Sequence, residues 1–357
     1  MEQLDLFAAA EQDPVPATFA ARSRQAPAPA LAAVNSDPGE SEASRRELPS
    51  PQARIPVPHH PAPLLAGNPR DAGRRLGEAV AETWHASNWA GSRIDVPISI
   101  IGGLALFPIK SHTQDVSRII TESSDYELLQ GYREIYAHTW ARRPDLGARM
   151  APLMSWLTED GLEEKAYAVR RVTETALRYG ILQLTGDPDP YHRADTDVMS
   201  WTITSLRSHG ARQGLGEYHT SPEVCEMMAA LIVGNEAPPK GQRFHEPAGG
   251  TGGMFRALAQ HLRHLHLDPA DYVWALNELE PIAAAGAAVN AVVWGLGPNV
   301  VIACGDTLAQ SDLHEQTARE RHALYEERDQ LLGYLSVVDA TRKAMALVDR
   351  IASAPAA

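Results

Sequence analysis

The stretch from His245 to Phe255 constrains the fold more than any other part of the chain. It reads His-Glu-Pro-Ala-Gly-Gly-Thr-Gly-Gly-Met-Phe, with four glycines in five positions. Glycine tolerates positive φ and has no side chain, so the backbone can turn sharply here and approach a ligand closely. Residues 242–244 favour a short strand, and apolar residues recur at roughly helical spacing from Met254 to Leu265. The glycines are therefore predicted to form the strand-to-helix turn of a Rossmann-like α/β unit.

Two further strands are predicted to end beside this turn. The first strand, Val273–Leu276, is followed by Asn277-Glu278-Leu279-Glu280-Pro281, and a helix is predicted from Ile282 to about Trp294. The second strand, Val300–Cys304, is followed by Gly305-Asp306-Thr307-Leu308. Because parallel strands end at the same edge of a sheet, the glycine turn, Glu278 and Asp306 are expected to converge there. Such a turn also serves nicotinamide and flavin cofactors, so the glycines alone leave the ligand open.

Four motifs follow one another along this part of the chain. They are Gly216-Glu217-Tyr218-His219-Thr220-Ser221-Pro222 before a helix, Glu246-Pro247-Ala248-Gly249-Gly250-Thr251-Gly252-Gly253, Glu278-Leu279-Glu280-Pro281 with Asn290 nine residues beyond the proline, and Gly305-Asp306-Thr307-Leu308. In this order they resemble the N6-adenine DNA methyltransferases, and within them the methylation subunit of type I restriction-modification systems. The resemblance covers about Leu215 to Leu308 and implies an α/β domain that binds S-adenosylmethionine.

The resemblance also implies a role for each residue of the site. Thr220 and the loop residues would hold the methionine part of the cofactor, Glu278 the ribose hydroxyls, and Asp306 the exocyclic amine of the cofactor's adenine. The loop residues are Glu246, Pro247, Ala248, Gly249, Gly250, Thr251, Gly252 and Gly253. The family usually has Asp at the position of Glu246, often Cys at that of Gly249, and Thr-Pro at that of Thr220-Ser221. For Thr220, a simple helix N-cap is the alternative.

The acceptor motif of such enzymes has no counterpart beyond Leu308. In the family, an Asn/Asp-Pro-Pro-Tyr/Phe motif after the third strand holds the amine of the target adenine and stacks on the flipped base. The nearest sequence, Asp187-Pro188-Asp189-Pro190-Tyr191, lies upstream, has an extra Asp between its prolines, and leaves few residues before Gly216 for a permuted catalytic half. No catalytic residue is assigned, and the chain is expected to hold the cofactor half of a methyltransferase without its catalytic half.

The rest of the chain divides into three further segments. Residues 1–70 are rich in proline and alanine and lack a sustained apolar period, which predicts a disordered tail. Residues 71–210 carry apolar residues mainly at helical spacing and predict a helical domain ahead of the cofactor-binding domain at 211–308. In residues 309–357, apolar residues at seven-residue spacing predict an amphipathic helix or hairpin that packs on the sheet or pairs with another chain: Leu324, Leu331, Val338 and Met345.

The tail begins with a short motif of its own. Gln3-Leu4-Asp5-Leu6-Phe7 resembles the pentapeptide by which bacterial replication proteins bind the sliding clamp. Leu4, Leu6 and Phe7 would fill an apolar pocket, and Gln3 would supply a polar contact. The alternative is a chance apolar start to the tail.

Charge bears on the partners of the chain. The net charge of −13 gives no overall attraction to DNA phosphates, so DNA contact is expected through a local patch or through a specificity or catalytic partner subunit. The pairs Arg74-Arg75, Arg142-Arg143 and Arg170-Arg171 each have an acidic residue within a turn and predict solvated helix faces.

Metal sites and membrane spans are not expected. Cys225 and Cys304 fall in a predicted helix and a predicted buried strand, and His59-His60 lacks a second ligand pair, so no metal site is predicted. No signal peptide opens the chain and the apolar run Ile98–Phe107 is too short to cross a bilayer, so a cytoplasmic location is expected.

Three functions stay open from the sequence. The first is an S-adenosylmethionine-binding DNA adenine-N6 methyltransferase-like protein of a modification or restriction-modification system; the missing motif leaves open whether this chain is an enzyme. The second is a non-catalytic, DNA-associated module linked to the replication machinery. The third, a nicotinamide-dependent oxidoreductase, lacks a catalytic acid beside a hydride path.

Overall fold

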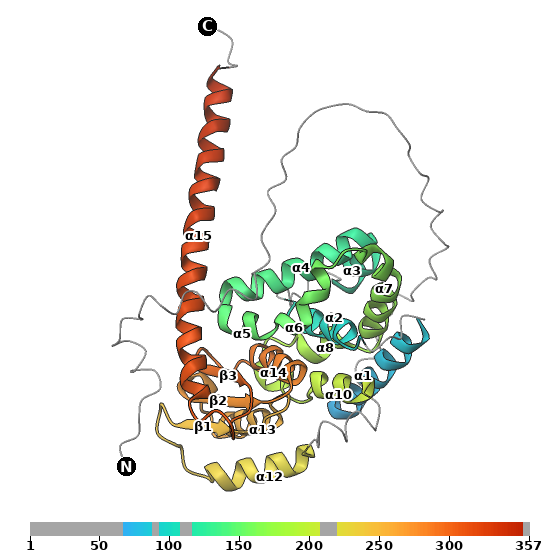
Figure 1. Cartoon of the computed structure of the whole chain (residues 1–357). Coiled ribbons are helices and arrows are strands. Elements are labelled where there is room, and N and C mark those ends of the chain that lie inside the picture. The colour runs from blue at the N-terminus through green and yellow to red at the C-terminus, as the bar shows by residue number, and fades with distance from the viewer. Residues whose placement is uncertain (1–66, 88–92, 108–115, 208–219, 353–357) are drawn as a thin grey trace.

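The computed structural model describes residues 67–87, 93–107, 116–207 and 220–352. Within them the chain is mostly helical with one small parallel sheet (Figure 1). The first half holds α1 (Pro69–Ala86), α2 (Asp95–Ala105), α3 (Val116–Glu122), α4 (Asp125–Arg142), α5 (Pro144–Arg149), α6 (Ala151–Met154), α7 (Leu162–Arg178), α8 (Ile181–Thr185), α9 (Pro190–Arg193) and α10 (Val198–Leu206). The second half holds α12 (Pro222–Val233), β1 (Arg243–Glu246), α13 (Gly253–His264), β2 (Val273–Glu278), α14 (Pro281–Val293), β3 (Val300–Cys304) and α15 (Leu313–Ala352). The helical character predicted before residue 210 is confirmed.

Local sequence explains where several helices begin. Pro69 opens α1, and the side chain of Asn68 before it accepts a hydrogen bond from the backbone N–H of Arg70 at 3.0 Å. A capping box opens α4, in which Ser124 and Glu127 each satisfy the backbone N–H of the other. The apolar run that begins at Ile98 forms most of α2, which is buried almost throughout. No helix in the described ranges is long and apolar enough to cross a membrane.

The sheet has the order β1-β2-β3, and its neighbouring strands are parallel. Because the three strands are parallel, they all end at one edge of the sheet, as predicted. Helix α13 connects β1 to β2, and α14 connects β2 to β3. The ring of Trp274 in β2 lies 5.2 Å from that of Phe244 in β1 and 5.0 Å from that of Phe255 in α13, between ring centroids. The elements expected from Val273 to Cys304 are confirmed. A complete Rossmann-like domain remains a prediction.

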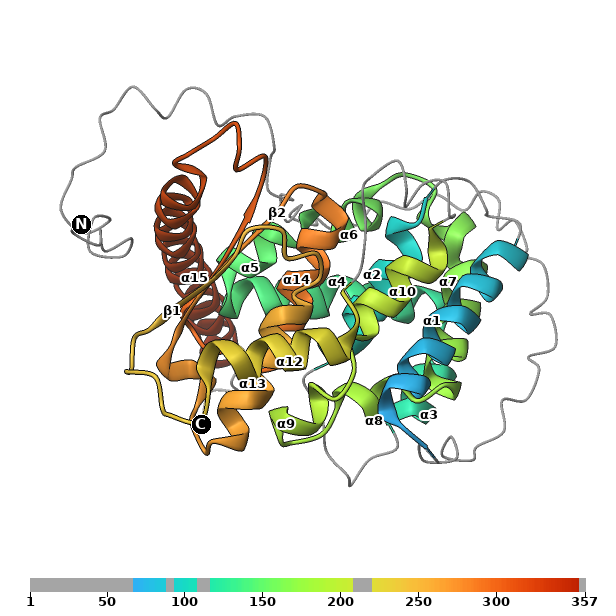
Figure 2. The same cartoon turned by 90° about the horizontal axis from the view of Figure 1, so that it is seen from below.

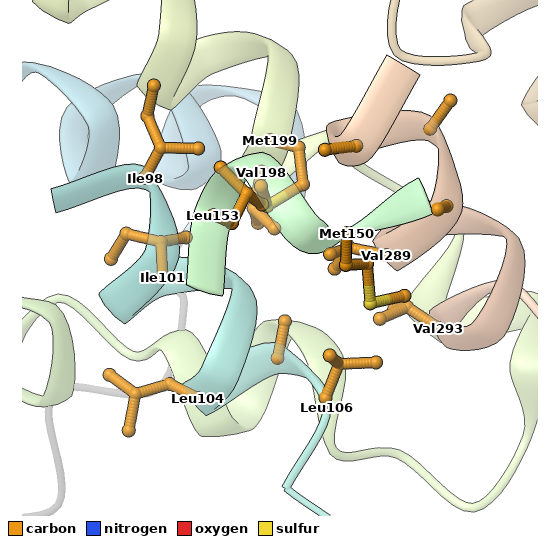
Figure 3. Close-up of a cluster of buried hydrophobic side chains, with 14 of the residues drawn as sticks. Ile98, Ile101, Leu104, Leu106, Met150, Leu153, Val198, Met199, Val289 and Val293 are labelled. Carbon is orange, nitrogen blue, oxygen red and sulfur yellow. The ribbon is translucent and has the colours of Figure 1, made fainter. Parts of the chain in front are cut away.

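One hydrophobic core joins the helices before residue 210 to the sheet-bearing segment. Figure 3 shows a cluster in which Ile101 of α2 and Met150 and Leu153 lie with Met199 of α10 and Val289 of α14. All five side chains are fully buried. Since burying a large apolar side chain contributes about 1.5–3 kcal/mol, the two segments stabilise each other. The boundary predicted at residue 210 therefore separates segments that share a core.

The last helix, α15, is one continuous element of 40 residues that projects beyond the rest of the described chain (Figure 1). Near its start, Arg321 Nε donates to the Asp145 carboxylate of α5 at 3.0 Å, and the Tyr325 hydroxyl donates to the same group at 3.3 Å. Burial alone would raise the pKa of Asp145, but Arg143 and Arg321 hold that pKa below its ordinary value. Of the helix and the hairpin considered for this segment, the structure has the helix, and Gly333 lies within it.

The arginine pairs meet the acids expected of them. Arg74 lies 2.9 Å from Glu78, Arg143 lies 2.9 Å from Asp145, and Arg171 lies 3.8 Å from Glu174. Cys225 is buried in α12 and Cys304 is partly buried at the end of β3, and both are free thiols. The side chains of Arg143 and Arg170 are only 18% and 14% exposed, so the prediction of solvated faces is wrong for these two residues. Cys225 is buried as predicted, whereas Cys304 is only partly buried.

Candidate functional site

The glycine loop joins β1 to α13 at the carboxyl edge of the sheet. It folds back on β2, since the backbone N–H of Gly249 donates to the carbonyl of Asn277 at 2.8 Å. Gly250 and Gly252 have φ of 53° and 93°, in the left-handed region that favours glycine. Gly252 is also the N-cap of α13, and it has no side chain with which to cap the helix. The positive end of the α13 dipole therefore opens onto the loop without a side-chain cap.

Gly249 and Gly250 are glycines for different reasons. A Cβ atom at Gly249 would lie 2.4 Å from Cγ of Leu276, so packing on β2 leaves no room for it. The family often has cysteine at this position, and the close packing of Leu276 explains why glycine stands here. A Cβ atom at Gly250 would meet no atom within 4 Å. A ligand can thus approach the backbone at Gly250.

Residues at the end of β2 hold the neighbouring loops together. The Glu278 carboxylate accepts from the backbone N–H of Gly250 at 2.8 Å through Oε2 and from that of Glu280 at 2.9 Å through Oε1. Nδ2 of buried Asn277 donates to the carbonyls of Pro247 and Gly305, both at 3.2 Å, and so ties the loops after β1 and β3. Because each carboxylate oxygen has two lone pairs, Glu278 retains capacity to accept from a ligand hydroxyl.

Two further acidic residues border the site, and they differ in how far their carboxylates are used in hydrogen bonds and ion pairs within the fold. Asp306 follows β3 and is exposed, and its Oδ1 accepts from the backbone N–H of Leu308 at 2.9 Å. Glu280 caps α14 by accepting from the backbone of Ile282 and Ala283, and it lies 2.6 Å from buried Arg207. Glu280 therefore serves the fold, whereas Asp306 is accessible to a ligand.

Thr220 and Glu246 complete the predicted set. Thr220 is exposed and stands before Ser221, which is the N-cap of α12, so the N-cap alternative for Thr220 is wrong. Glu246 ends β1 and is partly buried. Burial raises the pKa of its carboxyl, and a hydrogen bond from the backbone N–H of Ala248 opposes this rise.

A polar network lies beneath the loop. Oγ1 of Thr251 donates to Oδ2 of Asp197 at 2.7 Å, and Nδ2 of Asn290 donates to Oδ1 of Asp197 at 2.8 Å and to the carbonyl of Thr251 at 2.9 Å. Asn290 and Thr251 are buried. Asp197 also caps α10 by accepting from the backbone N–H of Ser200. Sequence reasoning missed Asp197, and the spacing of Asn290 after Pro281 was the one signal that pointed to this network.

The near-miss sequence Asp187–Tyr191 lies at the opposite end of α13 from the glycine loop. The Tyr191 hydroxyl lies 3.2 Å from Nε2 of His264, the last residue of that helix. At a rise of about 1.5 Å per residue, a helix of 12 residues places the two ends about 18 Å apart. Asp189 serves as the N-cap of α9. This sequence therefore cannot position an acceptor at the glycine loop.

Two cavities lie away from the loop. One, of about 770 Å³, is lined by residues of α1, α9, α12 and α13, including Tyr191. The other, of about 220 Å³, is a groove between the end of α12 and β1. No three or more His, Cys, Asp or Glu side chains in the described ranges are grouped so that they could hold a metal ion. The clamp-like peptide Gln3–Phe7 and His59-His60 lie outside the described residues.

The site thus brings together, at one edge of a parallel sheet, a glycine loop, an acidic residue at the end of the second strand and an aspartate after the third. The sequence model of the N-6 DNA Methylase family matches residues 196–323, which contain the three strands, Asp197 and Asn290. For this part of the chain, the resemblance to the N6-adenine DNA methyltransferases is confirmed.

Among solved structures, the chain is similar to the methyltransferase subunit of the type I restriction-modification system from Streptococcus thermophilus. The two share 14% sequence identity with a TM-score of 0.34 over 67% of this chain and 60% of that chain. The matched part thus falls well short of the length of that subunit. Comparison with curated proteins gives no match.

Proposed function

We propose that the chain binds S-adenosylmethionine at the carboxyl edge of its sheet, as the cofactor-binding part of a DNA adenine-N6 methyltransferase in a modification or restriction-modification system. One observation carries the proposal. Asn277 and Glu278 at the end of β2 are hydrogen-bonded to the loops after β1 and β3, so the groups expected to contact the cofactor border a single site.

The groups of the site fit the parts of this cofactor. The start of α13, which has no side-chain cap, suits a carboxylate, such as that of the methionine part. Glu278 suits the ribose hydroxyls and Asp306 suits the adenine amine. When bound, the cofactor supplies a methyl group activated by its sulfonium. Direct transfer to adenine N6 requires no metal and no covalent enzyme intermediate.

Calorimetry with S-adenosylmethionine tests the proposal. Glu278→Gln and Asp306→Asn should each weaken binding by about 1–3 kcal/mol, as expected for losing a charge-assisted hydrogen bond. Asp268→Asn is a matched control, because Oδ1 of Asp268 accepts from the backbone N–H of Ala270 at 2.9 Å in the same kind of turn before β2. That variant should bind as wild type does. No heat from the wild-type chain at millimolar cofactor would refute the proposal.

A second function is a non-catalytic DNA-associated module that reaches the replication machinery through its N-terminal peptide. The absence of the acceptor motif from the sequence supports it, as does the position of Asp187–Tyr191 away from the loop. Its test is binding of a peptide of residues 1–12 to the bacterial sliding clamp, which Leu6→Ala with Phe7→Ala should abolish. Equal binding by the doubly substituted peptide would contradict it.

A further inference from the structure

Two histidines from distant parts of the chain meet beside the sheet. His245 lies in β1, and His314 lies near the start of α15, 69 residues further along the chain. Their Nε2 atoms are 2.9 Å apart. Figures 1 and 2 both show β1 and the start of α15 side by side. Because the two residues are so far apart in sequence, no spacing of ligands along the chain reveals the pair.

The geometry of the pair suits two ligands of a single ion. The ring planes stand at 85° to each other, and the ring centroids lie 4.7 Å apart, closer than for two imidazoles placed end to end at this nitrogen separation. The two Nε2 atoms therefore meet at an angle instead of along one line. Since an imidazole nitrogen lies about 2.1 Å from a bound metal ion, one ion in contact with both nitrogens would hold them at an angle of about 90°.

The second nitrogen of each ring is compatible with this arrangement. Nδ1 of His314 is buried and has no hydrogen-bond partner within the described ranges, so Nε2 is the nitrogen of that ring that can take a ligand. His245 is exposed, and its ring can change tautomer by exchanging a proton with water. Without an ion, one Nε2–H has to donate to the other Nε2. Once each ring carries its proton on Nδ1, both Nε2 lone pairs can bind a metal ion.

The ligand set narrows the kind of ion. Imidazole nitrogen suits transition metals, whereas Mg²⁺ and Ca²⁺ prefer oxygen ligands. In the part of the chain that the structure describes, no third His, Cys, Asp or Glu joins the pair, so water has to occupy the remaining coordination positions. An angle of about 90° between ligands is typical of tetragonal or octahedral Cu²⁺ and Ni²⁺, and Zn²⁺ prefers the wider tetrahedral angle.

We propose that His245 and His314 together bind one divalent transition-metal ion, Cu²⁺ or Ni²⁺ in preference to Zn²⁺, which ties β1 to the start of α15. The ion has a structural role and takes no part in methyl transfer. The proposal goes beyond the proposed function and does not depend on it.

The ion would join the two flanks of the candidate cofactor site. On one flank, Glu246 and the glycine loop follow His245 directly. On the other flank, Leu313 at the start of α15 packs on the loop after β3, since its Cδ atoms lie 3.2 and 3.3 Å from the position that a Cβ atom of Gly305 would take. Because the ion binds groups that come together only in the folded chain, it should stabilise the fold.

Calorimetry with NiCl₂ on the full chain, purified without a polyhistidine tag, tests the proposal. All proteins carry His59→Gln with His60→Gln, which removes the adjacent histidine pair of the N-terminal segment. We expect one Ni²⁺ per chain and no heat from Mg²⁺. His245→Gln and His314→Gln should each weaken Ni²⁺ binding by about tenfold or more. His322→Gln is the matched control on α15, where the side chain is 59% exposed, and should bind as the parent protein does.

Glutamine separates a metal ligand from a hydrogen-bonding partner. Its amide can still hydrogen-bond to the remaining imidazole, so a pair that serves only as a hydrogen bond would be largely preserved. Ni²⁺ should raise the melting temperature of the parent protein and leave that of His245→Gln unchanged. Since His245 is exposed, this variant should melt as the metal-free parent does, which shows that the fold is intact.

Electron paramagnetic resonance of bound Cu²⁺ identifies the ligands. The parent protein should show coupling to two imidazole nitrogens, and either single variant should show coupling to one. Absence of binding at millimolar Ni²⁺ and Cu²⁺, or binding that both variants leave unchanged, would overturn the proposal. Equal loss of binding in His322→Gln would also overturn it, because the ion would then lie elsewhere. Tighter binding of Zn²⁺ than of Ni²⁺ would contradict the arrangement at about 90°.

Discussion

The glycine loop is held from below by a polar network of buried and partly buried side chains, and it is bordered above by one partly buried and one exposed carboxylate. The two sets differ in how their hydrogen bonds are used. Asp197, Thr251 and Asn290 are hydrogen-bonded to one another, and of the three Thr251 and Asn290 are buried and Asp197 is partly buried. Glu278 and Asp306 bond to backbone N–H groups and keep acceptor capacity toward solvent. The lower set therefore stabilises the fold, and the upper set is available to a ligand.

Neither set contains a group that would hold the target adenine, and the largest expected effect follows from this. We expect the purified chain alone to transfer no detectable methyl to adenine in any DNA. Without groups that position the adenine beside the cofactor, the reaction loses an effective molarity on the order of 10⁵ M or more, and its rate falls below detection. Incorporation of labelled methyl into unmodified DNA measures this. Robust incorporation by the lone chain, lost in Asp306→Asn, would contradict the prediction and would require an adenine site among residues of this chain.

The lower set should govern stability. Asn290→Leu keeps the volume but removes two hydrogen bonds, one of them to the Asp197 carboxylate, and should lower the free energy of unfolding by about 2–4 kcal/mol. Urea denaturation measures the change. Asn235→Leu is the matched control at an exposed position, where a change within about 0.5 kcal/mol is expected. If the free energy of unfolding fell as little as in the control, the network would not stabilise the fold.

Sequence reasoning predicted the parts of this comparison that depend on local patterns. Glycine spacing and the apolar runs after Gln242 fix β1, β2 and β3 and the loops after them, because strands and turns leave a short-range signal. The convergence of Glu278 and Asp306 then follows from parallel topology. Of the two acids at the end of β2 and just after it, the resemblance implied a ligand role for Glu278, and the structure commits Glu280 to α14 and Arg207.

The remainder depends on contacts between distant segments. Asp197 lies 54 residues before Thr251 and belongs to α10, so no local pattern connects the two. A helix after Pro222 was predicted, but its two apolar sides are alike in sequence. Only packing on α13 decides that Cys225 and Ala229 are buried while Leu231 is exposed. The exclusion of Asp187–Tyr191 likewise needed its place at the far end of α13.

The smallest expected effect concerns Glu246, which belongs to neither set. Because burial raises the pKa of its carboxyl in the folded chain, folding favours the protonated form. Its contribution to the free energy of unfolding is therefore fully present below the ordinary pKa and is lost as pH rises through the raised one. Glu246→Gln removes this titration. Between about pH 4 and pH 7, urea denaturation should show the variant gaining stability relative to wild type.

The affinity for the cofactor shows whether the stability lost by burying Glu246 is associated with ligand binding. An ionised Glu246 beside the cofactor's ammonium group would make wild-type affinity rise with pH through the pKa of Glu246, and Glu246→Gln would bind more weakly at neutral pH without that rise. Glu236→Gln, at an exposed position in the loop after α12, should alter neither the stability slope nor the affinity. Greater stability with unchanged affinity would mean that Glu246 lowers stability without contributing to cofactor binding. Greater stability with weaker binding is the outcome expected of a charge retained at the end of β1 for a ligand.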